Sequence, residues 1–330
     1  MKLNISLEDA KELRKRYNEP WRFYHNENHI INLIEKFTSL KHDKGLTEEE
    51  LDTMIEAAYY HDVVYNPWSR TNEEDSVEFY KTSVPNPKDE VIEIILGTKE
   101  REKSEGKLSS IFWEVDNSIL KSDIPTLMEY EKKIFKEFQF VDYSVYKEGR
   151  IDFLKTCLGK FDNDENLQFL ITYLENFVPK IGFYPGSFNP MHIGHMKVIE
   201  QAEKIFDKVV IGIGENPDKD SKTVIEDVEK TIGGRQLEVY TGLTTDVISK
   251  LSESGKVTLI RGLRNGDDLA YENNQLEIMK DVKEVIDGNR EVDVVYIPCD
   301  KKHDHISSTL IRKLMAAGYE DKLDDLEYLP

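Results

Sequence analysis

The sequence contains no apolar run near the roughly 20 residues that a membrane-spanning helix needs. Residues 1–16 mix charged with apolar side chains and lack the apolar core of a signal peptide. Cysteine is scarce: Cys157 and Cys299 stand alone, one in each half, which excludes a disulfide framework or a thiolate metal site. Together these features predict a cytoplasmic protein in a reducing compartment, without a membrane partner.

Basic residues are few relative to acidic ones. The chain has 44 Lys and Arg against 64 Asp and Glu, a formal net charge of −20, and both halves are acidic. Nucleic-acid polymers are held mainly by Lys and Arg contacts to phosphates, so this balance argues against a nucleic-acid partner. Small phosphorylated ligands remain possible, because a few cations focused in a cleft can bind them.

The chain of 330 residues is too long for one ordinary core and predicts two domains, residues 1–178 and 180–330. The first has apolar residues at spacings of three and four throughout, which predicts an all-α domain. Ser6 and Thr47 precede acidic first turns, and Asp123 precedes Ile-Pro, as is typical of helix starts. The expected helices are Leu7–Tyr17, His29–Leu40, Glu48–His61, Glu73–Lys81, Lys88–Leu96, Thr126–Phe138, Tyr146–Thr156 and Glu165–Phe177.

In the second domain short apolar strands alternate with helices. The expected strands are Ile181–Tyr184, Lys208–Ile213, Glu238–Tyr240, Val257–Ile260 and Val292–Ile297, with helices near 194–206, 245–252 and 269–287. This alternation predicts a doubly wound, Rossmann-like α/β fold with a parallel sheet. Ligands of such sheets bind beyond the carboxyl ends of the strands.

The segment from Gly186 to His195 follows the first of these strands and opens a helix. It places two imidazoles, His192 and His195, among free backbone N–H groups at a helix N-terminus, where anions are favoured. Gly194 permits close approach of the backbone to a nucleotide. The alternative is a strand-to-helix turn with a chance pair of histidines.

Further polar segments follow the later strands. Lys219 comes after the second strand, and Arg261-Gly262-Leu263-Arg264 comes after the fourth, with Asp268, Tyr271 and Glu272 behind it. After the last strand, the run from Ile306 to Arg312 is a hydroxyl-rich helix start that can donate to phosphate oxygens. A solvated turn is the alternative reading of the two arginines.

These motifs resemble the HxGH nucleotidyltransferase superfamily and, in detail, the phosphopantetheine adenylyltransferases. The resemblance rests on the spacing from His195 to Lys219, the Arg-Gly-Leu-Arg element with its acidic and tyrosine residues, and the final Ser-Ser. It implies transfer of AMP from ATP, with Mg²⁺, to 4′-phosphopantetheine, giving dephospho-CoA and pyrophosphate. It also implies a homo-oligomer built on this domain.

The resemblance also implies roles for individual residues. The acceptor phosphate would contact Ser187, Lys219, Thr244 and Arg261. ATP would contact Gly186, Ser187, Phe188, His195, Gly262, Arg264, Glu272, Ser307, Ser308 and Thr309. Catalysis would fall to His195, Lys219 and Arg264, with His192 either assisting or supporting the loop.

Three departures leave the acceptor open. Leu269-Ala270 replaces the usual Phe-Glu, and residues 221–234 lack the usual Phe…Glu-Arg helix opening. The Ile-Ser-Ser-Thr-Leu-Ile-Arg ending at 306–312 is also common in nicotinamide mononucleotide adenylyltransferases. Nicotinamide mononucleotide, and hence NAD synthesis, is the alternative acceptor. A sensor that binds ATP without turnover is a further alternative.

The first domain carries a second constellation of polar residues. His25 and His29 are four residues apart and share a helix face, His61 and Asp62 are adjacent, and Asp116 follows later. Imidazoles and carboxylates brought together from separate helices suit Mn²⁺, Fe²⁺, Zn²⁺ or Mg²⁺. A lone His-Asp pair is otherwise a surface or capping pair.

The motifs at 24–29, 61–65 and 72–76 resemble the HD superfamily of metal-dependent phosphohydrolases. The resemblance implies a divalent metal held by His29, His61, Asp62 and Asp116, with His25 as a further ligand or phosphate contact. It implies metal-assisted hydrolysis of a phosphomonoester or diester. Glu73 is either the general base or a helix cap. The whole chain is therefore expected to be bifunctional, and the alternative makes the first domain a regulatory nucleotide-binding or assembly module.

Overall fold

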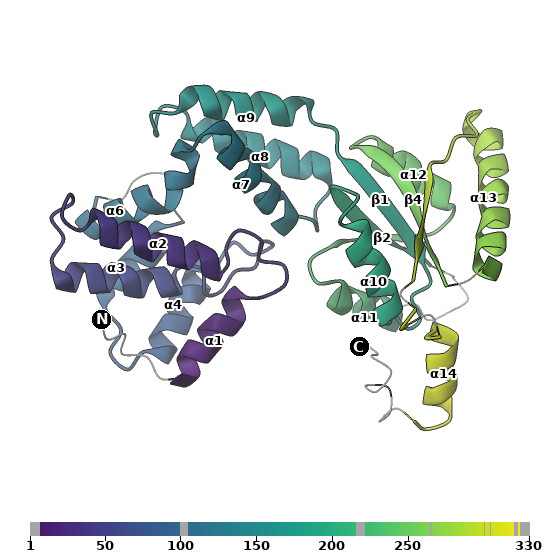
Figure 1. The fold of residues 1–330 in the computed structure, drawn as a ribbon, viewed down its shortest axis with the longest axis horizontal. Helices are drawn as coiled ribbons and strands as arrows, with labels where there is room; N and C mark the ends of the chain where they lie inside the picture. The colour runs from purple at the N-terminus through teal and green to yellow at the C-terminus, as the bar shows by residue number, and fades with distance from the viewer. Residues whose placement is uncertain are drawn as a thin grey trace. The chain divides into compact units, whose positions relative to one another are not determined.

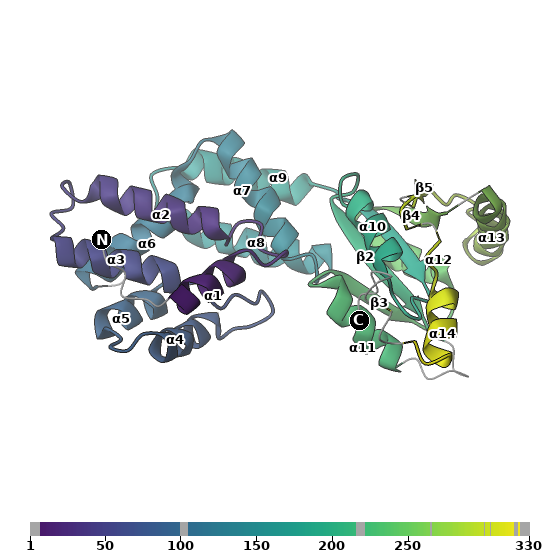
Figure 2. The same cartoon turned by 60° about the horizontal axis from the view of Figure 1, so that its bottom comes forward.

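A computed structural model describes residues 7–99, 105–215, 222–264, 266–299, 301–303, 305–319 and 323. The chain separates into two compact units, which Figures 1 and 2 show from two directions. The helical unit comprises Met1–Phe138 and Glu148–Glu175, and the α/β unit comprises Gln139–Lys147 and Asn176–Pro330. Within the described residues, no helix is long and apolar enough to span a bilayer.

The helical unit is built from helices in its described part, as the sequence predicts. The elements are α1 (Leu7–Tyr17), α2 (Glu27–Leu40), α3 (Glu48–Tyr60), α4 (Asn72–Ser83), α5 (Asp89–Gly97), α6 (Lys107–Asp116), the short 3₁₀ helix η1 (Asn117–Lys121), α7 (Ile124–Glu137), α8 (Tyr143–Cys157) and α9 (Asp164–Asn176).

Local sequence signals account for several helix starts. Thr47 and Glu50 form a reciprocal capping box at the start of α3. The Asp123 side chain accepts a hydrogen bond from the backbone N–H of Thr126 at the start of α7. Ser6 lies outside the described residues. Helix α6 is missing from the sequence-based prediction because its N-cap, Gly106, offers no side-chain bond, and its apolar residues are spread too widely for a clear stripe.

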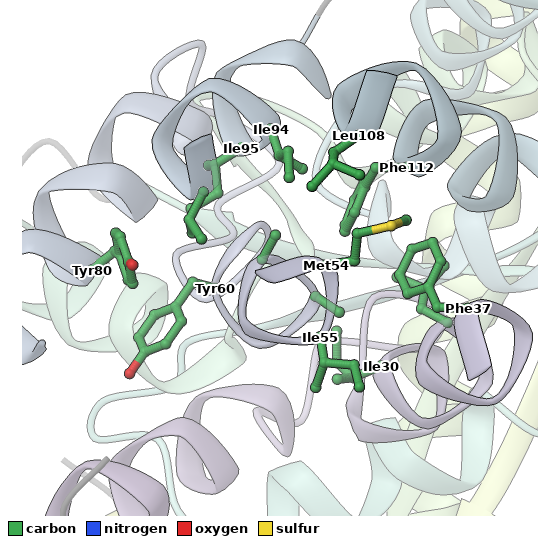
Figure 3. Packing of buried hydrophobic residues seen from close by; sticks show 14 of the residues in the cluster. Ile30, Phe37, Met54, Ile55, Tyr60, Tyr80, Ile94, Ile95, Leu108 and Phe112 are labelled. Carbon is green, nitrogen blue, oxygen red and sulfur yellow. The ribbon is translucent and has the colours of Figure 1, made fainter. Parts of the chain in front are cut away.

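One apolar core holds helices α1 to α6 together, and Figure 3 shows part of it. Phe37 of α2 packs against Phe112 of α6 with ring centroids 5.2 Å apart, and both rings are fully buried. Tyr60 and Tyr80 meet edge to face at 4.9 Å on another side of α3. This core fixes the ends of α2, α3 and α6, which carry His29, His61 and Asp116.

Removing the Phe37 ring should test this packing. Phe37→Ala should destabilise the helical unit by about 3–5 kcal/mol, because it deletes a fully buried ring. The three tryptophans Trp21, Trp68 and Trp113 all belong to the helical unit, so urea unfolding followed by tryptophan fluorescence reports on that unit. Ile31→Ala, at a half-exposed position of the same helix, is the control and should cost little. Equal losses for both variants would contradict this view of the core.

The α/β unit contains five parallel strands and their connecting helices. The elements are β1 (Lys180–Gly186), α10 (Ile193–Ala202), β2 (Lys208–Gly214), α11 (Lys222–Ile232), β3 (Gln236–Tyr240), α12 (Thr244–Ser252), β4 (Lys256–Leu263), α13 (Gly266–Asp287), β5 (Val294–Pro298) and α14 (Ser308–Ala316). The strand order is β3-β2-β1-β4-β5, with every pair parallel. The expected parallel α/β sheet is confirmed.

Helices cover both faces of this sheet (Figure 1). On one face, apolar residues of α10 and α11 pack against Tyr184, Ile211 and Ile260. On the other face, residues of α12 and α13 pack against Phe183 and Val210. Neighbouring residues of one strand point to opposite faces, which explains the continuous apolar runs of β1 and β2.

Strand β4 and helix α11 are among the elements that differ from the sequence-based prediction. Strand β4 runs to Leu263, three residues beyond the expected end, so Arg261 lies in the strand and only Arg264 follows it. Helix α11 was not expected. Its Val224, Val228 and Ile232 recur every four residues and face the core.

A segment outside the sheet belongs to the same unit. Residues 139–147 run along the α/β unit, where the Lys208 ammonium donates to the Val141 carbonyl at 2.7 Å and also to that of Gln139. Ser254 donates to the Asp142 carboxylate at 2.7 Å. Lys208 is almost fully buried, and burial lowers its pKa to about 7. No motif or pattern in the sequence indicates that this stretch joins the second unit.

Candidate functional site

A polar pocket of about 380 Å³ lies in the α/β unit at the carboxyl ends of β1 and β4. The strand order reverses between these two strands, which is where doubly wound sheets bind ligands. The lining residues are Tyr184, Ser187, His192, Gly194, His195, Gly262, Arg264, Asp268, Tyr271, Glu272, Cys299, His303, Ile306, Ser307, Ser308, Thr309 and Arg312. Its volume is within the range of small-molecule sites.

The two histidines at the start of α10 cap the helix reciprocally. The Nδ1 atom of His192 accepts from the Gly194 backbone N–H at 3.1 Å, and the Nδ1 atom of His195 accepts from the His192 N–H at 3.2 Å. Their rings stack with centroids 3.8 Å apart. Because each Nδ1 is an acceptor, a neutral ring carries its proton on Nε2. Each histidine can therefore donate one hydrogen bond from Nε2.

Both rings are held in the neutral form. Burial lowers the pKa of His192 to about 4, and the positive charge of Arg264 adds to the effect. Burial also lowers the pKa of His195 well below its ordinary range, helped by His192 and Arg264. At neutral pH the pair therefore acts through hydrogen bonds and contributes no charge.

The ring of Phe188 packs against this pair of histidines through His195. Its ring is buried and meets His195 edge to face at 5.1 Å and Tyr184 at 5.3 Å. Its backbone φ of 41° lies in the left-handed region, which is unfavourable for a side chain of this size. The packing of its ring holds the backbone in this conformation and orients His195.

Arg264 is positioned by Asp268. Its Nε and Nη2 atoms donate to the two carboxylate oxygens at 2.9 and 3.0 Å, and its backbone N–H donates to the same carboxylate. Such a bidentate pair fixes the plane of the guanidinium group. Arg261 forms an ion pair with Glu272 at 3.1 Å, from a position one residue before Gly262 in the strand.

The N-terminus of α14 closes another side of the pocket. The Ser307 hydroxyl caps the helix by accepting from Leu310, and Ser308 donates to the Pro190 carbonyl at 2.8 Å. Arg312 contacts the Asn189 carbonyl and the Thr309 hydroxyl. These contacts join α14 to the loop before α10. Two helix N-termini, of α10 and α14, thus border one pocket, and both favour anions.

The sequence-predicted residues of this unit divide into three groups. Ser187, His192, His195, Gly262, Arg264, Glu272, Ser307, Ser308 and Thr309 line the pocket together. Gly186, Phe188, Thr244 and Arg261 are not among the residues that line it. Lys219 lies outside the described residues. Sequence reasoning missed Tyr184, Cys299 and His303, which line the pocket from strand ends and a loop without a motif.

A second group of polar residues lies in the helical unit. Ligand atoms of His29, His61 and Asp116 lie within 4.8 Å of one another. His29 Nε2 is 3.1 Å from the Asp116 carboxylate, and His61 Nε2 is 3.0 Å from the Asp62 carboxylate. Asp62 also lies 4.0 Å from His29. Three separate helix ends, of α2, α3 and α6, bring these side chains together, as a metal site in a bundle requires.

Charge coupling within this group is strong. Burial lowers the pKa of His61, but the charge of Asp62 and its hydrogen bond outweigh burial and raise the pKa to about 9. Burial raises the pKa of Asp116, yet its hydrogen bond and charge interaction with His29 lower it overall. Imidazole and carboxylate donors of this kind fit a divalent transition metal or Mg²⁺.

Glu137 has a role that no sequence motif indicates. Its buried carboxylate accepts hydrogen bonds from the Tyr65 hydroxyl at 2.9 Å and the Tyr24 backbone N–H at 2.7 Å, and it lies 2.6 Å from the Nδ1 atom of His25. His25 therefore lies outside the group of three ligand atoms. Its charge partner is Glu137, more than a hundred residues away in the chain.

Glu73 lies near the same site but makes a different contact. It is on the first turn of α4, and Lys99 lies 3.9 Å from its carboxylate. Burial raises its pKa, and the negative charge of Asp62 adds to that effect. No side-chain hydrogen bond caps α4 at its N-cap, Thr71, so the helix cap, one of the two roles considered for Glu73, has no such bond to support it.

Comparison with known proteins finds relatives of the α/β unit. A family model described as cytidylyltransferase-like matches residues 183–314. The phosphopantetheine adenylyltransferase of Leuconostoc mesenteroides is 30% identical over 148 residues, covering 43% of this chain and 85% of that protein. The protein of the same name from Streptococcus pneumoniae strain R6 is 34% identical over 152 residues, covering 43% and 86%. A solved structure described as a putative nicotinate-nucleotide adenylyltransferase from Vibrio parahaemolyticus is 19% identical, with a TM-score of 0.33, and covers 46% of this chain and 87% of that one.

The lowered pKa of His192 predicts a pH dependence of stability. The pKa is about 4 in the folded protein and 6.5 ordinarily, so the unfolded chain binds more protons between these values. Acidification from pH 7.5 to 5 should therefore cost the α/β unit roughly 2 kcal/mol through this residue. Urea unfolding at each pH, read by hydrogen-exchange labelling of peptides from β1, measures the loss.

Two variants separate this effect from general acid sensitivity. His192→Asn keeps a side-chain acceptor but cannot take up a proton in this range, so its stability should fall less between the two pH values. His305→Asn, at an exposed position, should retain the full pH dependence. An unchanged pH dependence in His192→Asn would contradict the assignment.

Proposed function

Because the chain belongs, through its C-terminal region, to the cytidylyltransferase-like nucleotidyltransferases, with adenylyltransferases among its relatives, we propose that the α/β unit transfers AMP from ATP to 4′-phosphopantetheine. The products are dephospho-CoA and pyrophosphate. The pocket carries the proposal: two neutral histidines, an oriented arginine and two helix N-termini border one polar space of sufficient volume for a nucleotide. The names of the relatives support phosphopantetheine as the acceptor.

The reaction needs positioned phosphates and no covalent intermediate with the protein. An oxygen of the acceptor phosphate attacks the α-phosphorus of ATP, a new P–O bond forms, and the bond to the β-phosphate breaks so that pyrophosphate leaves. Negative charge grows on the leaving phosphates. Mg²⁺ that arrives with ATP would neutralise part of this charge.

The pocket residues would supply the remaining stabilisation. The Nε2–H groups of His192 and His195 donate to phosphate oxygens, and Arg264 contributes the positive charge that the neutral histidines lack. The backbone N–H groups at the start of α14 bind the leaving phosphates. Ser187, Thr244, Arg261 and Lys219 would hold the acceptor. The expected homo-oligomer stays a prediction.

Pyrophosphate release from ATP tests this proposal. Release is expected with 4′-phosphopantetheine, and Arg264→Ala should lower kcat/KM about 10²–10³-fold, because it removes a donor aimed at developing charge. Arg290→Ala is the matched control, since Arg290 is an exposed arginine of the same unit outside the pocket lining. Turnover with nicotinamide mononucleotide alone would overturn the acceptor. ATP binding without pyrophosphate release would favour a nucleotide sensor.

A specific observation favours a second function in the helical unit. The ligand atoms of His29, His61 and Asp116 lie together, with Asp62 beside them. We propose that these four residues hold a divalent metal and that the unit is a phosphohydrolase of the HD type. A metal ion held there would supply Lewis acidity for phosphate ester hydrolysis. Tyr24 and Phe112 flank His29 and His61 and limit the motion of both rings.

Metal content tests this second function. Asp116→Asn should lose bound metal in the purified chain, because it replaces a charged ligand by a neutral amide. Asp52→Asn, at an exposed position of α3, is the control and should keep it. Elemental analysis after loading with Mn²⁺ measures the metal per chain. Equal metal in the two variants contradicts the site, and a metal-free protein whose His61→Ala variant changes only assembly supports a regulatory module.

A further inference from the structure

A small cavity of about 130 Å³ opens directly beside the proposed metal ligands of the helical unit. His29 and Asp116 form part of its wall. The rest of the wall comes from the segment before α2, from α2 itself, from the end of α6, from η1 and from α7, and it includes Lys36 and Lys133. The cavity therefore belongs to one unit and adjoins the site of the expected chemistry.

The charge in this cavity is opposite to that of the protein. The chain carries a net charge of −20, yet the described residues that line the cavity include two lysines and a single carboxylate, Asp116. Three asparagines add neutral hydrogen-bonding groups. In an acidic protein, cations gathered in a concave site select an anionic ligand.

Lys36 is held in position for such a ligand. Its ammonium group donates to the Ser118 hydroxyl at 2.7 Å, which leaves two of its three N–H donors for other acceptors. Ser118 in turn donates to the Val115 carbonyl at 2.5 Å, one residue before Asp116. Lys36 is thereby anchored to the same chain segment that carries a proposed metal ligand.

The size of the cavity suits a phosphate group. Its volume of about 130 Å³ is well above the roughly 10–15 Å³ that one water molecule needs in a cavity. Phe23, whose side chain is exposed, offers apolar surface beside the cavity for the organic part of a ligand.

We propose that this cavity binds the terminal phosphate of a phosphomonoester in preference to a phosphodiester, with Lys36 and Lys133 as phosphate-binding residues. A monoester phosphate carries nearly two negative charges at neutral pH, matching two lysines, whereas a diester carries one. Hydrolysis adds water: a P–O bond to the water oxygen forms, the ester P–O bond breaks, and the alcohol leaves with a proton. This inference rests on the proposed hydrolase function of the unit.

A matched pair of aromatic esters tests the inference in the full chain. The probes are p-nitrophenyl phosphate and bis(p-nitrophenyl) phosphate, titrated calorimetrically in EDTA so that binding is measured without metal. The monoester should bind at least tenfold more tightly than the diester. Lys36→Gln and Lys133→Gln should each weaken monoester binding about tenfold, the loss of one charge-assisted hydrogen bond.

Lys132→Gln is the matched control, because Lys132 is an exposed neighbour of Lys133 on α7 and does not line the cavity. Its binding should stay within twofold of the wild type. All variants should keep adenylyl transfer and the tryptophan-monitored unfolding of the wild type, which excludes misfolding. Monoester binding that is unaffected by both Lys36→Gln and Lys133→Gln, or equal binding of the diester, overturns the inference.

Nitrophenol release with Mn²⁺ separates this inference from the function on which it rests. Lysine-dependent binding in EDTA without release under Mn²⁺ would retain the phosphate site and remove the hydrolase function. Release that is lost in Asp116→Asn but unchanged in Lys36→Gln and Lys133→Gln would retain the hydrolase and remove the phosphate site. The expected result is faster release of nitrophenol from the monoester than from the diester, reduced by both lysine substitutions.

Discussion

The parallel pairing of β1 with β4 is the constraint on which the α/β unit depends. Residues 180–183 align with residues 256–259, so the two strands end at the same edge of the sheet. The loop after β1 carries the histidine pair, and the turn after β4 carries Arg264. Neither segment could form the pocket alone. Strands β2 and β5 lie on opposite sides of this pair in the sheet. The connections after β1 and β4 therefore run in opposite directions, and the crevice between them is open to a ligand.

Buried histidines serve opposite electrostatic roles in the two units. In the α/β unit, burial and the nearby arginine lower the pKa of His192 and His195, so the rings stay neutral. In the helical unit, Asp62 raises the pKa of His61 despite similar burial. The sign of the nearest charge decides the outcome. A neutral pair suits hydrogen bonding to phosphates, whereas a cluster rich in carboxylates suits a cation.

Local signals made much of the fold predictable from sequence. The caps at Thr47 and Asp123 and the alternation of strands with helices are properties of a few adjacent residues. The histidine motif of α10 is local too. The role of Glu137 could not be predicted from the sequence. Its partners, His25 and Tyr65, are 112 and 72 residues away in the chain, and no spacing rule links them to it. The strand order and the extension of β4 past Arg261 likewise depend on pairing between distant segments.

The chain passes between its two compact units three times, after Phe138, after Lys147 and after Glu175. Helix α8 is continuous across the second of these points. A fragment that starts at the sequence-predicted boundary near Pro179 would therefore lack residues 139–147 and leave the buried Lys208 ammonium without two carbonyl acceptors. No single cut in the chain separates the two compact units from each other. An α/β fragment would keep this support only if it began no later than Gln139, and it would then retain residues 148–175 of the helical unit.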